Sequence, residues 1–233
     1  MTSAVFSAFL LDWFVVAFER QKIKPLTKIL AMVMVIFWTL QGVRWSPDAY
    51  IILLLLAQLF GLTGDIFLLL ADKWFFAGLG AFLIGHFFYA SLIFFDIFSS
   101  INSTTLMKSL FVPMIIAVVF WGVMLLIIYR FFKREYFVMH RKGKMLWRLL
   151  QVYIWVLSGL SAMTVFWTLS QSNTTLQMVL LPVGGILFLL SDTVLAYNRF
   201  VHPIPKGQLW VRITYHLAQF SLAAGFLSLM GRI

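Results

Sequence analysis

Two aspartates lie within long apolar segments of this sequence, and they are the residues best suited to chemistry. Asp65 follows a glycine, Asp192 follows a serine, and an apolar run continues after each of them. A carboxyl group at bilayer depth costs roughly 2.5–3.5 kcal/mol on insertion scales, so such a group usually faces a bundle interior and serves a function. The alternative is structural: the two acids fix helix packing by pairing with Arg212 or Lys28. Because the same local pattern occurs twice, we favour the functional interpretation.

The two aspartates are expected at similar depths in the membrane. Each lies 16 residues after the expected start of its helix, which places both roughly 24 Å along at about 1.5 Å per residue. The two carboxyl groups could therefore meet. One protonated and one ionised carboxyl group can divide general acid and general base work, as they do in glycoside hydrolysis. The sequence does not assign the two roles.

The composition requires membrane helices to hold these acids. The 233 residues are 62% hydrophobic and 11% charged, with a mean hydropathy of +0.97, whereas soluble domains are about 25% charged. The apolar segments approach the roughly 20 residues that a helix needs to cross the hydrocarbon core, and none alternates like a barrel strand. We therefore predict an all-α, polytopic integral membrane bundle made by one domain, residues 1–233. Its eight transmembrane helices are expected at residues 4–18, 26–43, 49–70, 74–95, 110–132, 148–170, 176–197 and 210–231.

The distribution of positive charge predicts the orientation of this bundle. Fifteen of the eighteen Lys and Arg residues follow the first, third, fifth and seventh expected helices or flank those connections. Because cytoplasmic loops carry the excess of Lys and Arg, we predict cytoplasmic basic loops and both termini outside. We expect the bacterial cytoplasmic membrane as the location. The formal charge of +10 is explained by this topology and by contact with anionic lipid, without a nucleic acid partner.

Polar residues also recur on the helices that follow the two aspartates. The last expected helix carries a stripe with the i, i+3, i+4, i+7 spacing of one helix face, and this stripe should face the bundle centre. It consists of Arg212, Tyr215, His216 and Gln219. His86 and Tyr89 occupy the fourth expected helix, which follows Asp65 in the same way. This correspondence suggests a parallel repeat of four plus four helices.

The same residues permit a metal site, although the sequence argues against one. His86 and His216 could join the two aspartates as a two-histidine, two-carboxylate zinc site. Neither histidine lies in a metal-binding motif, and the chain has no cysteine to supply a thiolate. Gly-x-Ser-x-Gly and glycine-rich phosphate loops are also absent from the sequence. We predict that no metal or other cofactor is required.

Five short segments resemble the YhhN-type lysoplasmalogenase family, in the family's order and spacing. They are residues 24–28, 61–68, 82–89, 185–192 and 215–219. The resemblance implies an eight-helix membrane hydrolase that cleaves the vinyl ether bond of lysoplasmalogens without a cofactor. The products would be a fatty aldehyde and glycerophosphocholine or glycerophosphoethanolamine. The expected partners are thus a vinyl ether lysophospholipid and membrane lipids.

The chemistry implied by the resemblance suits the residues singled out above. Protonation of the vinyl ether at its β-carbon gives an oxocarbenium ion that water attacks, so an acid and a base are needed. We expect Asp65 and Asp192 to be these catalytic groups. Other groups are expected to orient water or substrate or to bind the lipid phosphate: Lys24, Lys28, His86, Tyr89, Ser191, Arg199, Tyr215, His216 and Gln219. For the three cations Lys24, Lys28 and Arg199, a purely topological role is the alternative.

Two other functions remain open at this point. Paired intramembrane carboxylates also suit a transporter or flippase that relays protons between two repeats. A zinc-dependent lipid amidase that uses the two histidines is the third possibility.

Overall fold

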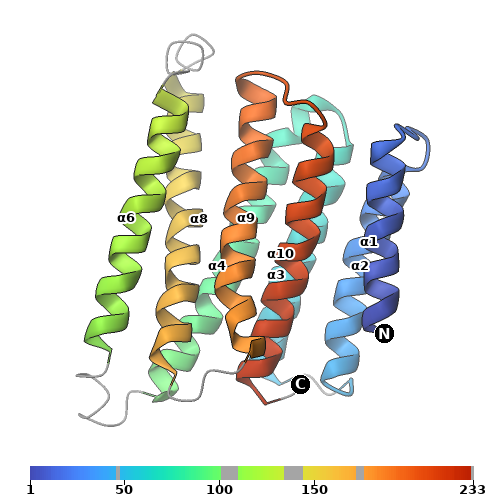
Figure 1. Ribbon diagram of the computed structural model, residues 1–233. Helices are drawn as coiled ribbons and strands as arrows, with labels where there is room; N and C mark the ends of the chain where they lie inside the picture. The colour runs from blue at the N-terminus through green and yellow to red at the C-terminus, as the bar shows by residue number, and fades with distance from the viewer. Residues whose placement is uncertain (46–47, 101–109, 134–143, 172–175, 232–233) are drawn as a thin grey trace.

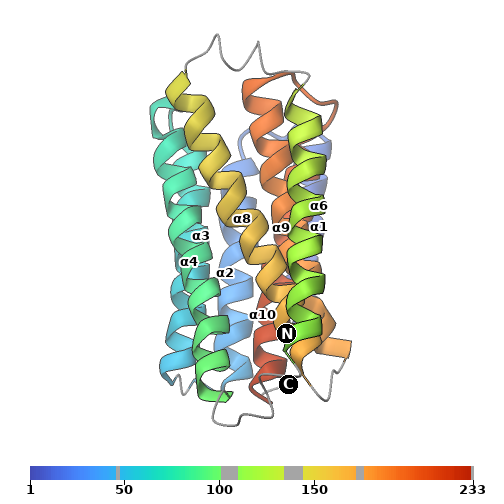
Figure 2. The same cartoon turned by 90° about the vertical axis from the view of Figure 1, so that its left-hand side faces the viewer.

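The structure, a computed structural model, describes residues 1–45, 48–100, 110–133, 144–171 and 176–231, and it contains helices and no strand in those ranges. The predicted all-α fold is therefore confirmed. The helices are α1 (Thr2–Ala17), α2 (Lys24–Gly42), α3 (Ala49–Leu69), α4 (Phe75–Ser100), α6 (Phe111–Lys133), α8 (Lys144–Ser170), α9 (Leu176–Phe200) and α10 (Gly207–Leu229), with a short 3-10 turn η1 (Asp72–Trp74) before α4. They stand side by side as one bundle (Figures 1 and 2).

Six of these helices are long and apolar enough to cross a membrane: α2, α3, α4 with η1, α6, α8 and α9. The protein is therefore an integral membrane protein. Of the other two predicted spans, α1 has only 16 residues, and α10 carries the polar stripe of Arg212, Tyr215, His216 and Gln219. The stripe is buried, because α10 packs against α9, α2, α1 and α3. The low hydropathy of α10 thus reflects a position inside the bundle.

The N-terminal end of α1 and the C-terminal end of α10 lie at the same end of the bundle (Figure 1). The opposite end, which we call the basic end, carries the described cations Arg20, Lys22, Lys73, Arg199 and Lys206 at the α1–α2, α3–α4 and α9–α10 connections. The predicted basic connection at residues 134–143 lies outside the described residues. This arrangement is compatible with the predicted topology, but the number of membrane spans and the side of the termini stay predictions.

The absence of cysteine from the sequence allows a direct test of that side. A single thiol in water reacts with a charged maleimide, whereas a thiol across the membrane does not. In intact cells, the variant Ser3→Cys at the terminal end should be labelled, and Lys73→Cys at the basic end should be labelled only after lysis. Both original residues are exposed. The opposite labelling pattern would invert the topology.

The helix packing follows the predicted repeat. The contacts α1–α2, α2–α3 and α3–α4 recur in the second half as α6–α8, α8–α9 and α9–α10. The halves also join in an equivalent way, through α4–α8 and through α10–α2. The symmetry is broken at the periphery, where α1 touches α10 while α6 packs mainly on α8. This arrangement supports the parallel repeat of four plus four helices inferred from the sequence.

Small residues set the closest helix contact. A Cβ atom on Gly184 of α9 would lie 2.9 Å from the backbone nitrogen of Leu222, and one on Gly225 of α10 would lie 2.9 Å from that of Leu181. The two backbones therefore approach too closely for any side chain at either glycine, as is common between membrane helices. This tight α9–α10 pair fixes the depth of the polar stripe of α10 relative to α9.

Candidate active site

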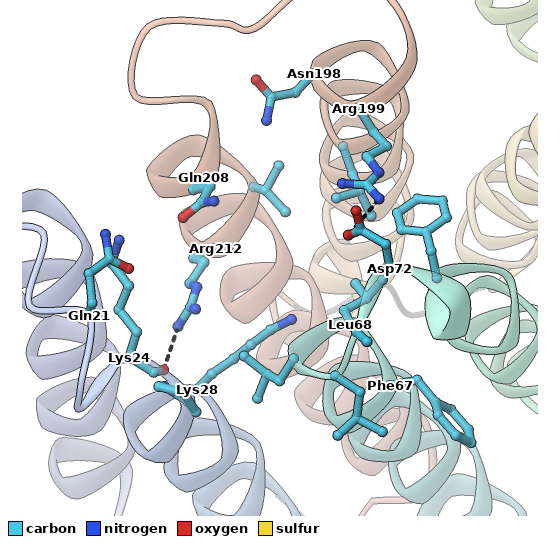
Figure 3. Close-up of a pocket in the computed structure, with 17 residues that line it drawn as sticks. Gln21, Lys24, Lys28, Phe67, Leu68, Asp72, Asn198, Arg199, Gln208 and Arg212 are labelled. Atoms are coloured by element: carbon cyan, nitrogen blue, oxygen red, sulfur yellow. Dashed lines mark hydrogen bonds and ion pairs between the residues drawn. The ribbon is translucent and has the colours of Figure 1, made fainter. Parts of the chain in front are cut away.

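A cavity of about 400 Å³ opens at the basic end of the bundle. This volume lies within the roughly 300–1,000 Å³ that ligand pockets occupy. Four cations line it, and they come from α2, α9 and α10: Lys24, Lys28, Arg199 and Arg212. Figure 3 shows these side chains around one space, with the amides of Gln21, Asn198 and Gln208 near them. The predicted cations Lys24, Lys28 and Arg199 therefore do share one cavity.

The two catalytic candidates lie one helical turn deeper than this cavity. Leu68 and Leu195 line it, and each follows an aspartate, Asp65 or Asp192, by three residues on the same helix. Residues at this spacing share a helix face and differ by about 4.5 Å in height. Both aspartate side chains are buried. The expectation that the two acids occupy similar depths is thus supported by the lining of the cavity.

Asp65 is paired with a cation that also lines the cavity. The Nζ atom of Lys28 lies 2.8 Å from Oδ1 of Asp65, and both side chains are buried. Lys28 therefore connects the cavity floor to the buried carboxylate. The hydroxyl of Tyr215 on α10 also lies close to Asp65. Three helices, α2, α3 and α10, thus converge on this carboxyl group.

A hydrogen-bonded chain extends from Tyr215 towards α4. Nε2 of Gln219 donates to the Tyr215 hydroxyl at 3.3 Å, and the Tyr89 hydroxyl donates to Oε1 of Gln219 at 2.7 Å. Gly61 makes room for this chain, because a Cβ there would lie 2.7 Å from Nε2 of Gln219. The structure therefore brings together three predicted polar residues, Tyr89, Tyr215 and Gln219, beside Asp65.

Asp192 has a different set of partners. The Tyr153 hydroxyl of α8 donates a hydrogen bond to Oδ2 of Asp192, and Nε2 of His86 on α4 lies 3.8 Å from the same oxygen. His86 is buried, and neither of its ring nitrogens makes a hydrogen bond within the described residues. The imidazole of His86 is thus a neighbour of the Asp192 carboxyl group at a distance longer than a hydrogen bond.

Aromatic rings connect the two carboxyl groups. The Phe188 ring lies 4.4 Å from the His86 ring and 5.5 Å from the Tyr215 ring, measured between centroids. Among the described residues, no hydrogen bond or ion pair joins Asp65 directly to Asp192. The two acids therefore occupy adjacent polar groups that share an aromatic wall. The partners also follow the repeat, since α3, α2 and α10 surround Asp65 while α9, α8 and α4 surround Asp192.

A third buried polar group lies between α1, α2 and α10. Arg212 forms an ion pair with Asp12 and donates to the backbone carbonyl of Lys24 at 3.2 Å. The hydroxyl of Thr27 donates to Asp12 at 2.6 Å. This group compensates the charge of an intramembrane acid and ties α1 to the bundle.

The structure places His216 in this third group, away from the predicted site. Trp13 donates to Nδ1 of His216 at 3.2 Å, and the Phe9 ring stacks on the imidazole at 4.9 Å. Oδ2 of Asp12 lies 3.9 Å away. The zinc hypothesis required His86 and His216 to meet, but each histidine neighbours a different aspartate. Over the described ranges, no group of three potential metal-binding side chains is formed.

Ser191 and Tyr153 show where the sequence-based site was incomplete. The Ser191 hydroxyl donates to the backbone carbonyl of Val211, so this residue joins α9 to α10. Sequence reasoning missed Tyr153, although it lies on the same face of α8 as Ser161, Thr164 and Thr168, at spacings of 8, 11 and 15 residues. All four side chains are buried. This polar stripe in an otherwise apolar helix is the sequence signal that could have identified Tyr153.

The comparison with protein families identifies the chain. A family model described as the YhhN family matches residues 23–226. The chain belongs to the YhhN family. The matched region runs from α2 to α10, so it includes all the residues around both aspartates of this YhhN protein, and the predicted resemblance is confirmed.

A curated relative matches a short part of this YhhN protein. Lysoplasmalogenase TMEM86B of Sus scrofa is 53% identical over 36 residues, which are 16% of this chain and 16% of the relative. The chain thus spans about a sixth of the length of that relative in the match. No solved structure matches.

Proposed function

We propose that this YhhN protein hydrolyses the vinyl ether bond of lysoplasmalogens to a fatty aldehyde and a glycerophosphodiester. The observation that carries the proposal is the position of Lys28, which lines a cationic cavity and holds the buried Asp65 at 2.8 Å. A phosphate in the cavity and a reacting bond one turn deeper suit a lipid with a polar head and one chain. The family and the name of the partial relative support this substrate class.

The cavity cations are proposed to bind the lipid phosphate. Lys24 and Arg199 line the cavity beside Lys28 and Arg212, the two cations that neutralise Asp65 and Asp12. A phosphate forms strong charge-assisted hydrogen bonds with such groups. With its phosphate there, the lipid would place the vinyl ether about one helical turn deeper, at the level of the two aspartates.

Asp192 and Asp65 are proposed to act as acid and base on this bond. Asp192 protonates the β-carbon of the vinyl ether, and the double-bond electrons form that C–H bond, which leaves an oxocarbenium ion. Asp65, whose charge Lys28 balances, takes a proton from the attacking water. The hemiacetal then collapses to aldehyde and alcohol: Asp65 gives its proton to the glycerol oxygen as the C–O bond breaks, and Asp192 takes the proton of the hemiacetal hydroxyl, which restores both groups. The rings of Phe188 and Tyr215 stand where they can stabilise the cation.

Release of aldehyde by the purified protein tests this proposal. The protein in detergent should release aldehyde from a 1-alkenyl lysophospholipid and none from the matching 1-alkyl ether, which cannot be protonated to an oxocarbenium ion. Loss of activity in the presence of a chelator, with recovery on addition of a metal, would instead support metal catalysis. Stable activity without metal would fit the two carboxyl groups.

Selectivity for the lysolipid is a second expected property of this site. The cavity has a volume of about 400 Å³ and lies beside the interior of the helical bundle, where one chain should fit more easily than two. The free glycerol hydroxyl would then face the polar residues of α10. Intact plasmalogen, which carries a second acyl chain, should be cleaved at least about tenfold more slowly, a loss of roughly 1.4 kcal/mol in transition-state binding. Equal kcat/KM values for the two lipids would contradict a single-chain site.

Proton-coupled transport is the second candidate, and the repeated helix packing favours it. The α3 and α9 acids occupy equivalent places in the two halves, as coupling residues do in repeat transporters. Proteoliposomes that show pH-driven lipid or solute flux, together with no aldehyde release, would support transport over hydrolysis.

A further inference from the structure

The mouth of the cavity carries a pair of opposite charges that the proposed reaction does not use. Asp72 on η1 is the acid that lines the cavity, and its Oδ1 atom lies 2.7 Å from Nη2 of Arg199 (Figure 3). The Asp72 side chain is 87% exposed and that of Arg199 is 39% exposed. An exposed ion pair contributes little to stability. Both groups remain available to a ligand.

This pair is complementary to a zwitterionic lipid headgroup. In such a headgroup an ammonium group lies two carbon atoms beyond the phosphodiester. A phosphate held by Arg199 would therefore place the ammonium group next to Asp72, so that each charge of the ligand meets its opposite. The other cavity cations, Lys24 and Lys28, extend the positive side of this arrangement inward. Asp72, the one carboxylate among the described residues that line the cavity, lies at the cavity mouth.

We propose that Asp72 binds the headgroup ammonium and that the site prefers ethanolamine over choline. This inference rests on the proposed function, because it concerns the substrate of the same cavity. A primary ammonium group donates up to three charge-assisted hydrogen bonds to carboxylate oxygens. The trimethylammonium group of choline has no N–H group, and proteins recognise it with aromatic cages instead.

The aromatic residues of the cavity are already engaged with the protein's own groups. The guanidinium of Arg199 lies 5.2 Å from the centre of the Phe75 ring. The Phe67 ring stacks on Trp74, with 5.6 Å between centroids. Phe76 and Phe200 also make perpendicular ring contacts with Phe75. Among its described lining residues, the cavity thus presents an exposed carboxylate, but no set of open ring faces that could enclose a quaternary ammonium group.

Direct binding of ligands that cannot be cleaved tests the proposal apart from catalysis. The probes are 1-alkyl lysophospholipids with the same chain and one of three heads: phosphoethanolamine, phosphocholine or phosphate alone. Binding to the purified full chain in detergent would be followed by intrinsic tryptophan fluorescence. The ethanolamine lipid should bind roughly fivefold more tightly than the choline lipid, the size expected of a charged contact at an exposed site.

The variant Asp72→Asn should remove this preference. Ethanolamine lipid binding should weaken roughly fivefold, choline lipid binding should change less than about twofold, and the phosphate lipid should bind equally well or better because Arg199 is freed. The matched control is Glu19→Gln, which removes one negative charge from an exposed position of the α1–α2 connection that does not line the cavity. It should leave all three affinities unchanged.

The outcomes separate this inference from the proposed function. Equal affinities for ethanolamine and choline lipids, or equal losses of both in Asp72→Asn, would overturn the ammonium site and leave the hydrolase proposal standing. The expected preference without aldehyde release from alkenyl lipids would support the headgroup site and overturn hydrolysis. Failure of the unsubstituted protein to bind any of the three lipids would overturn both.

Discussion

Each of the variants Asp65→Asn and Asp192→Asn is expected to lose about 10²–10⁴-fold in vinyl ether cleavage, the range for removal of a general acid or base. Asparagine keeps the size of the side chain and removes the proton that the reaction needs. Aldehyde release under saturating lysolipid measures the loss. The double variant should be scarcely slower than the slower single variant, because groups that act as one unit are not additive.

The control for this experiment is Asp96→Asn. Asp96, on α4, also has a carboxyl group inside an apolar helix. It accepts a hydrogen bond from Trp167 near the end of the bundle that lies opposite the cavity. Its replacement should leave turnover within about twofold, because asparagine keeps the size of the side chain and Asp96 lies away from both catalytic candidates. Near-normal turnover by a well-folded Asp65→Asn or Asp192→Asn protein would return that aspartate to a packing role.

The largest expected loss of stability comes from the third polar group. The variant Arg212→Met leaves Asp12 buried without its cation, and breaking a buried ion pair from one side costs about 3–5 kcal/mol. Thermal unfolding in detergent should therefore shift to a clearly lower temperature. The double variant Asp12→Leu with Arg212→Met should recover much of the loss, because no charge is then left uncompensated.

The exposed ion pair at the cavity mouth provides a comparison for this loss of stability. Arg199→Met also breaks an ion pair, with Asp72, but both partners of that pair are solvent-accessible. Its cost should stay within about 1 kcal/mol. If Arg212→Met and Arg199→Met lowered the unfolding temperature equally, the Asp12 pair would not be the α1 anchor that its burial indicates.

The helices could be predicted from the sequence, because the length and spacing of apolar segments depend only on residues that are close together in the chain. The differences lie at the ends: α4 continues to Ser100 and α8 begins at Lys144, beyond the predicted limits of 95 and 148. Hydropathy falls where a helix reaches the interface, but backbone hydrogen bonding continues past that point. Hydropathy alone therefore does not give the first and last residues of a membrane helix.

The partners of the buried acids could not be predicted in the same way. Helix periodicity places Arg212, Tyr215, His216 and Gln219 on one face of α10, but this face meets more than one neighbour. Arg212 and His216 turn to Asp12 of α1, whereas Tyr215 and Gln219 lie beside α3 and α4. Tertiary packing decides which neighbouring helix contacts each part of this polar stripe. A sequence alone carries no direct record of it.

The interleaved partners of the acids have a consequence for how the protein is made. Asp65 has Lys28 from its own half and Tyr215 from the other half, and Asp12 has its cation on α10. The ribosome completes α10 after the seven helices before it. The first half therefore enters the membrane with Asp12 lacking its counter-ion, and insertion of α10 both neutralises that charge and completes the surroundings of Asp65. If the proposed function holds, we expect the protein to become active only once α10 has inserted.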